Sequence, residues 1–70
     1  MATPRQFTFS DLEFLCEVYA KIADCYVTLS RRSSRTVILS ICSSSYYNFV
    51  FSYRDCFEYL KGCISRIIYG

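Results

Sequence analysis

Thiols are the most reactive side chains that this sequence offers, because it contains five cysteines and no histidine. Histidine is the usual general base and a frequent metal ligand, so its absence removes the ordinary route to both kinds of chemistry. No two cysteines have the C-x-x-C spacing of a zinc site or a redox pair. We expect no metal and no cofactor, and we expect small buried apolar thiols rather than redox-active or exposed ones. The five cysteines are Cys16, Cys25, Cys42, Cys56 and Cys63.

The other candidates for catalysis do not form a recognisable arrangement. Cys56 is expected in the first turn of a helix beside Asp55, whose negative charge disfavours the thiolate. Glu13 and Glu17 share one helix face, but Glu13 is expected to cap that helix. The serines lack both a G-x-S-x-G context and a histidine base. The sequence therefore predicts no catalytic residues and a protein that is not an enzyme.

A cluster of three arginines, Arg31, Arg32 and Arg35, is the main concentration of charge. The guanidinium group presents a rigid fork of donors that suits carboxylates and phosphates. The cluster could therefore contact an acidic protein surface or a nucleic acid, or it could be a solvated hairpin tip that discourages aggregation at the sheet edge. A net charge of +2 is small for a domain that binds nucleic acid unaided.

Composition limits the architecture that can position these residues. The chain has 70 residues, of which 53% are hydrophobic and 20% charged, and this balance excludes intrinsic disorder. The length allows one domain, residues 1–70, and excludes a two-lobed enzyme. The first six residues lack the apolar stretch of a secretory signal, and residues 36–53 are uncharged but too rich in serine for a membrane span. We therefore expect a reduced, cytoplasmic protein without a membrane partner, in the host cytoplasm if it is phage-encoded.

Residues about 10–23 are predicted to form the first helix, because apolar side chains recur there every three or four positions. Ser10 and Glu13 have the residue types and spacing of a capping box at its start. Phe9 and Phe14 are placed to form a hydrophobic staple across that cap.

Residues about 25–31, 35–42 and 46–52 are predicted to be strands, because each is rich in β-branched or aromatic residues. The connections between them are short, and parallel strands would need longer crossovers. We therefore expect an antiparallel meander.

Residues about 53–68 are predicted to form the second helix, with Ser52 as its N-cap. Gly62 weakens this helix, but apolar residues keep the helical period beyond it, so we expect continuation. The predicted fold class is α+β with the order α-β-β-β-α: a three-stranded antiparallel meander with both helices packed on one face.

Alternation along the strands assigns two faces to the sheet. The predicted helix-covered face comprises Val27, Leu29, Val37, Leu39, Ile41, Phe49 and Phe51. The opposite face is more apolar than an ordinary solvated sheet surface, and it comprises Tyr26, Thr28, Ile38, Ser40, Tyr46, Asn48 and Val50. Such a patch marks a partner site, unless it only covers a small sheet or pairs in a homodimer. The predicted partner-binding residues are Tyr26, Arg31, Arg32, Arg35, Ile38, Tyr46, Asn48 and Val50.

The capped first helix, the strand-like segment 24–30 (DCYVTLS), the meander and the closing helix together resemble small phage-encoded anti-CRISPR proteins, which inhibit Cas proteins. The resemblance covers most of the chain but includes no shared motif, so it assigns no functional residue. It implies steric blocking of a larger nuclease complex. Inhibitors that mimic DNA are typically very acidic, which this chain is not.

The sequence as a whole predicts a small non-enzymatic module that binds a larger protein, most concretely an inhibitor or regulator from a phage or mobile element. The alternative is a small nucleic-acid-binding module in which the three arginines contact phosphates while Tyr26 or Tyr46 stacks on bases. A third arrangement is a homodimer formed through the exposed sheet face.

Overall fold

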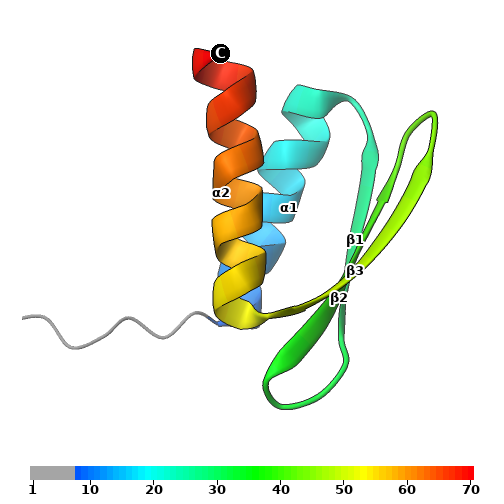
Figure 1. Ribbon diagram of the computed structural model, residues 1–70, viewed down its shortest axis with the longest axis vertical. Helices are drawn as coiled ribbons and strands as arrows, with labels where there is room; N and C mark the ends of the chain where they lie inside the picture. Colours follow the sequence, from blue (N-terminus) through cyan, green and yellow to red (C-terminus); the bar gives the residue numbers. More distant parts are fainter. Residues whose placement is uncertain (1–7) are drawn as a thin grey trace, which may run out of the picture.

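Two helices and three strands in the order α-β-β-β-α make up residues 8–70, the part of the chain that the computed structural model describes (Figure 1). This order and its α+β class confirm the prediction. The observed strands begin and end within one residue of the predicted positions. The elements are α1 (Phe9–Ala23), β1 (Tyr26–Arg31), β2 (Thr36–Cys42), β3 (Tyr46–Ser52) and α2 (Tyr53–Tyr69).

The first helix begins earlier than predicted, because a different pair of residues caps it. The Thr8 hydroxyl accepts from the backbone N–H of Asp11 at 3.2 Å, and the Asp11 carboxylate accepts from the backbone N–H of Thr8 at 3.1 Å. The predicted capping box of Ser10 and Glu13 is therefore wrong. The staple is also wrong, because Phe9 lies inside the helix and the Phe14 side chain is 65% exposed.

A left-handed residue ends α1 and turns the chain toward the sheet. Asp24 has φ 55°, a conformation that short polar side chains tolerate better than most others do. The Ala20 carbonyl accepts from the backbone N–H groups of both Asp24 and Cys25, the latter at 3.1 Å, which closes the last turn of the helix.

The second helix follows β3 without a loop. The Ser52 hydroxyl accepts from the backbone N–H of Asp55 at 3.1 Å, which confirms the predicted N-cap. The helix runs through Gly62 to Tyr69, so the predicted continuation is also confirmed.

The strands form one antiparallel meander in the order β1-β2-β3. Val27 pairs with Ile41, and Leu39 lies between Leu29 and Phe49. The side chains that point to one face of the sheet therefore line up across all three strands. The central strand is β2, and β1 and β3 are both edges of the sheet.

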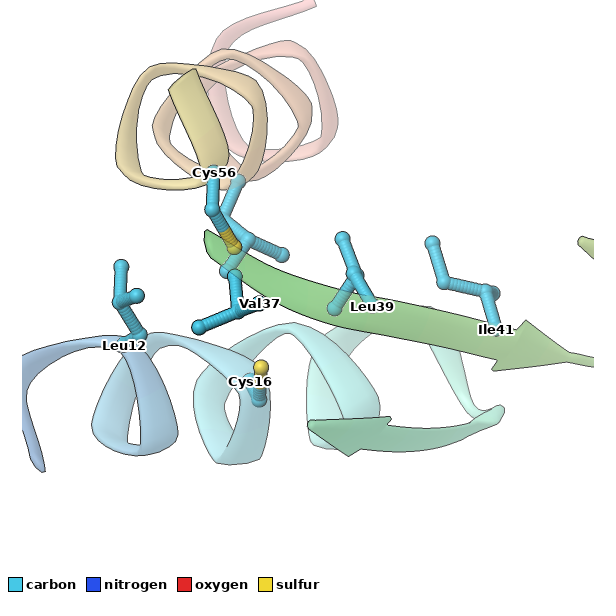
Figure 2. Packing of buried hydrophobic residues seen from close by; sticks show 7 residues of the cluster. Leu12, Cys16, Val37, Leu39, Ile41 and Cys56 are labelled. Atoms are coloured by element: carbon cyan, nitrogen blue, oxygen red, sulfur yellow. The ribbon is translucent and has the colours of Figure 1, made fainter. Parts of the chain in front are cut away.

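Both helices cover the same face of the sheet (Figure 1). Figure 2 shows Val37, Leu39 and Ile41 along β2, with Leu12 and Cys16 of α1 and Cys56 of α2 gathered near Val37. Residues predicted for this face are buried on β2 and half-buried on the two edge strands, so the assignment is confirmed. The fully enclosed core comprises Leu12, Cys16, Val37, Leu39, Ile41, Cys56 and Leu60.

The β2–β3 hairpin diverges from the helices toward its tip (Figure 1). Tyr47 has the parity of the covered face but is 52% exposed, because it lies at this end of the sheet. Its ring continues a row of stacked aromatics, with centroids 6.3 Å from Tyr47 to Phe49 and 5.4 Å from Phe49 to Phe51. Tyr59 of α2 packs on the last two rings, which joins the row to the helix layer.

Candidate partner-binding surface

The open face is the sheet surface that the helices leave uncovered. Strand register arranges its side chains in three cross-strand rows. The row nearest the β2–β3 turn is Tyr26–Cys42–Tyr46, the middle row is Thr28–Ser40–Asn48, and the row nearest the β1–β2 loop is Ser30–Ile38–Val50.

Apolar groups stand at the two ends of the open face. Tyr26 is 80% exposed and Tyr46 is 63% exposed, with Cys42 between them on the central strand. At the other end Val50 is 57% exposed, and it lies beside the half-buried Ile38. Large exposed aromatic rings with polar tips are typical of interface anchors, since they bury much area with few rotatable bonds.

A small polar network separates these apolar ends. The Ser40 hydroxyl donates to Oδ1 of Asn48, and the Tyr46 hydroxyl donates to the same oxygen at 3.2 Å. The network ties the Tyr46 ring to the middle row. Because both bonds use the amide oxygen, the N–H donors of Asn48 point away from these hydroxyls and can bond to water or a partner.

The arginines do not form one cluster in the structure. The Arg31 guanidinium lies over the Phe9 ring, with its carbon 5.0 Å from the ring centroid, and is therefore on the helix-covered side. Arg32 and Arg35 are exposed in the loop that joins β1 to β2. Arg31 therefore contacts α1 rather than the open face, and its role in partner binding stays a prediction.

Ser33 organises the loop that carries Arg32 and Arg35. Its hydroxyl lies 2.7 Å from the Thr36 hydroxyl and accepts from the backbone N–H groups of Arg35 and Thr36 at 3.3 and 3.2 Å. The loop stands at the end of the sheet opposite Tyr26 and Tyr46, about 17 Å away at the usual rise of a strand. The structure therefore does not bring the arginines together with the two tyrosines.

The five thiols are all free, and they differ in exposure. Burial raises the pKa of Cys16 to about 12, with smaller contributions from the neighbouring Cys56 and Glu13, and raises that of Cys56 to about 11. Both thiols are therefore protonated and unreactive near neutral pH. Cys42 is exposed on the open face, so the expectation that every cysteine is buried is wrong. Cys25 and Cys63 are intermediate.

A groove lies between α1 and β1, with a volume of about 290 Å³. Val27 and Leu29 of β1 form one wall, and α1 contributes two exposed carboxylates, from Glu13 and Glu17. The sequence interpretation missed this groove because it assigned Glu13 to the capping box. The spacing of the two acids on one helix face was the available signal. The α1 residues that line the groove are Glu13, Cys16, Glu17 and Ala20.

Neither a metal-binding group nor a membrane-spanning helix is found within residues 8–70. No three His, Cys, Asp or Glu side chains there are grouped closely enough to hold a metal ion. None of the helices in this part of the chain has the length and apolar character needed to cross a membrane.

No protein-family model, curated protein or solved structure matches this chain.

Proposed function

We propose that this protein is a small non-enzymatic binding module that docks on a larger protein through the open face of its sheet. The observation that carries the proposal is the exposure of Tyr26, Tyr46 and Val50, at 80%, 63% and 57%, on a face that neither helix covers. An apolar patch of this kind, with polar groups among its apolar ones, is characteristic of protein interfaces.

The chemistry of the open face suits a protein partner. Tyr26 and Tyr46 supply large aromatic surfaces, and Asn48 between the two apolar ends supplies amide donors for directional hydrogen bonds. Interfaces combine such aromatic anchors with a limited number of polar contacts that fix orientation. Arg32 and Arg35 stand at the far end of this face, where they would meet acidic groups of the partner and increase the rate of association.

Steric inhibition is the most concrete form of the proposal. A small domain can block a large complex by occupying its surface, which requires no catalytic group. The element order resembles that of small phage-encoded anti-CRISPR proteins, and on that resemblance the partner would be a nuclease complex. An inhibitor or regulator from a phage or mobile element is therefore the specific role that we propose.

Affinity capture with matched variants tests the open face. The tagged protein, its Tyr26→Ser/Tyr46→Ser variant and a Tyr69→Ser control are each incubated with lysate of the cell that naturally contains the protein. Tyr69 is 85% exposed at the end of α2, so the control removes a tyrosine of similar exposure from another surface. We expect the double variant to lose the captured partner while the control retains it.

Equal capture by the double variant and the wild type would overturn the proposal. Thermal unfolding of each variant verifies that the fold is kept, since both tyrosines lie outside the core. Sedimentation equilibrium distinguishes a homodimer from a monomer that binds another protein. A homodimer through the open face would show twice the 8.2 kDa mass of the chain.

The nucleic-acid alternative has its own test. The Arg32→Ala/Arg35→Ala variant and the wild type are titrated with labelled single-stranded DNA and RNA at several salt concentrations. A nucleic-acid module would bind with strong salt dependence, and the variant would bind more weakly with a shallower slope. No binding by the wild type, or binding that the variant leaves unchanged, eliminates this alternative.

A further inference from the structure

The outer edge of β1 is a second surface with the features of a binding site. Within residues 8–70, β1 pairs only with β2, so the backbone groups on its outer side have no strand partner. The α1–β1 groove runs along this strand. Exposed backbone donors and acceptors beside a groove are what an extended peptide needs to add itself to a sheet.

The groove combines an apolar wall with negative charge. Val27 and Leu29 present their side chains two residues apart, which is the spacing at which alternate side chains of an added strand would meet them. Glu13 and Glu17 stand one helical turn apart on the opposite wall, and both are exposed. Two like charges at this spacing destabilise a helix slightly, and a cation placed between them would relieve the repulsion.

The basic residue of β1 nearest this groove is engaged elsewhere. The Arg31 side chain lies over the Phe9 ring at the start of α1. Lys21 follows Glu17 one helical turn later on α1, so it can offset the charge of Glu17 but does not lie between the two carboxylates. A partner would supply a cation at that position.

We propose that the α1–β1 groove binds an extended segment of another protein, which adds to β1 as a fourth strand and places a lysine or arginine side chain between Glu13 and Glu17. Main-chain hydrogen bonds to β1 provide affinity that is independent of sequence, and the two carboxylates select the basic residue. This site lies on the helix-covered side of the sheet and does not depend on the proposed role of the open face.

A second copy of this chain fits the edge less well than a peptide. Pairing β1 with β1 of another copy would place the strands about 4.8 Å apart. The α1 helix of each copy packs over its own β1 on the same side, and packed helices need about 8–10 Å between their axes. An extended segment carries no such helix, and its side chains can enter the groove directly.

A designed peptide tests the site without knowledge of the natural partner. The probe is the acetylated and amidated peptide Thr-Val-Thr-Lys-Thr-Val-Thr, whose valines and lysine share one face when the peptide is extended. Its control replaces the lysine with glutamate. Each peptide is titrated into the full-length, isotope-labelled protein while backbone amide signals are followed by NMR.

We expect the lysine peptide to shift the amide signals of residues 26–31 and to bind at least about tenfold more tightly than the glutamate peptide. The Glu13→Gln/Glu17→Gln variant should lose most of this preference. Glu58→Gln is the matched control, since Glu58 is an exposed carboxylate on α2 and does not line the groove.

The proposal would be overturned by no shifts in β1 at millimolar peptide, by equal binding of the two peptides, or by an unchanged preference in the double variant. Shifts confined to Tyr26, Tyr46 and their open-face neighbours would also contradict it, because they would place the peptide on the other surface. Failure here leaves the capture experiment on the open face unaffected, so the two proposals can be separated.

Discussion

The two faces of the central strand β2 differ in their surroundings as well as in their composition. On the covered face Val37, Leu39 and Ile41 have exposed fractions of 0%, 0% and 6%. On the open face Ile38 is only half-buried and Cys42 is exposed, although both are apolar residues. This difference in exposure follows from the helices, which cover one side of the sheet only (Figure 1).

This difference separates two roles for apolar residues in a small domain. On the covered face they are removed from water, which is the main source of folding stability. On the open face Tyr26 and Tyr46 leave most of their surface in water, so they add little to the stability of the isolated chain. Their removal should therefore affect binding rather than folding, and each prediction below tests one aspect of this division.

Leu39→Ala should have the largest effect on stability. Leu39 is fully buried at the centre of the sheet, so the substitution removes apolar contacts and leaves a cavity, at a cost of about 2–5 kcal/mol in the free energy of unfolding. Val50→Thr keeps a β-branched side chain on the open face and should cost no more than about 0.5 kcal/mol. Urea denaturation measures both, and equal losses would contradict the division between the faces.

The cysteines allow the same comparison with a smaller change. Cys56→Ser puts a hydroxyl at a fully buried position in the core and should cost about 1–3 kcal/mol if that group finds no partner. Cys42→Ser changes an exposed thiol and should stay within about 0.5 kcal/mol of wild type. A loss at Cys42 comparable to that at Cys56 would mean that the open face is covered in solution, for example by a second copy.

The pKa values of the buried thiols predict a loss of stability at alkaline pH. The ordinary thiol value is 9.0, and burial raises the pKa of Cys16 to about 12 and that of Cys56 to about 11 in the folded state. The folded state therefore holds these protons more tightly than the unfolded state, so this contribution is complete below pH 9 and declines between about pH 9 and 12. Urea midpoints measured from pH 7 to 11 should fall above pH 9.

A control variant separates the thiols from other groups that titrate at high pH. Burial also raises the pKa of Tyr59, to about 12, so part of the decline belongs to that phenol. Cys56→Ala should be less stable at pH 7 but lose less on going to pH 11 than the wild type does. An identical pH dependence in the two proteins would contradict the assignment to Cys56.

Alternation and capping patterns predicted most of the fold, because both are local. The period of two assigned the faces of all three strands, and Ser52 correctly marked the start of α2. Alternation along the strands could also have assigned the correct sheet face to two residues for which the sequence analysis did not use it. Cys42 shares the parity of Ile38 and was therefore predictable as an open-face residue, and Arg31 shares the parity of Leu29 and lies on the covered side.

Other features could not be read from local sequence. Thr8 and Asp11 have the same spacing as Ser10 and Glu13, so two capping boxes compete and the pattern alone does not decide between them. The earlier cap places Phe9 in the helix, where it packs partly buried against the core and under Arg31. The spacing of Glu13 and Glu17 indicated that they share a helix face. Where that face meets β1 to form the groove depends on how α1 lies over the sheet, which is a tertiary property.

The competing caps give the next prediction. Thr8→Ala removes the hydroxyl that accepts from the Asp11 backbone and should cost about 1 kcal/mol. Ser10 lies exposed in the first turn of α1, so Ser10→Ala should be nearly neutral. Urea denaturation of the two variants checks this order. A larger loss in the free energy of unfolding for Ser10→Ala would indicate that Ser10 rather than Thr8 caps the helix.

The smallest predicted effect is a gain in stability at Gly62. A Cβ added there would meet no atom within 4 Å among the residues that the structure describes, and alanine favours a helix interior over glycine by about 0.5–1 kcal/mol. Gly70→Ala is the control, because its Cβ would lie 2.9 Å from the Arg66 carbonyl oxygen at the C-cap of α2, so no gain is expected. If Gly62→Ala instead weakened partner capture while raising the unfolding temperature, this side of α2 would be a contact surface as well. The open face would then not be the whole interface.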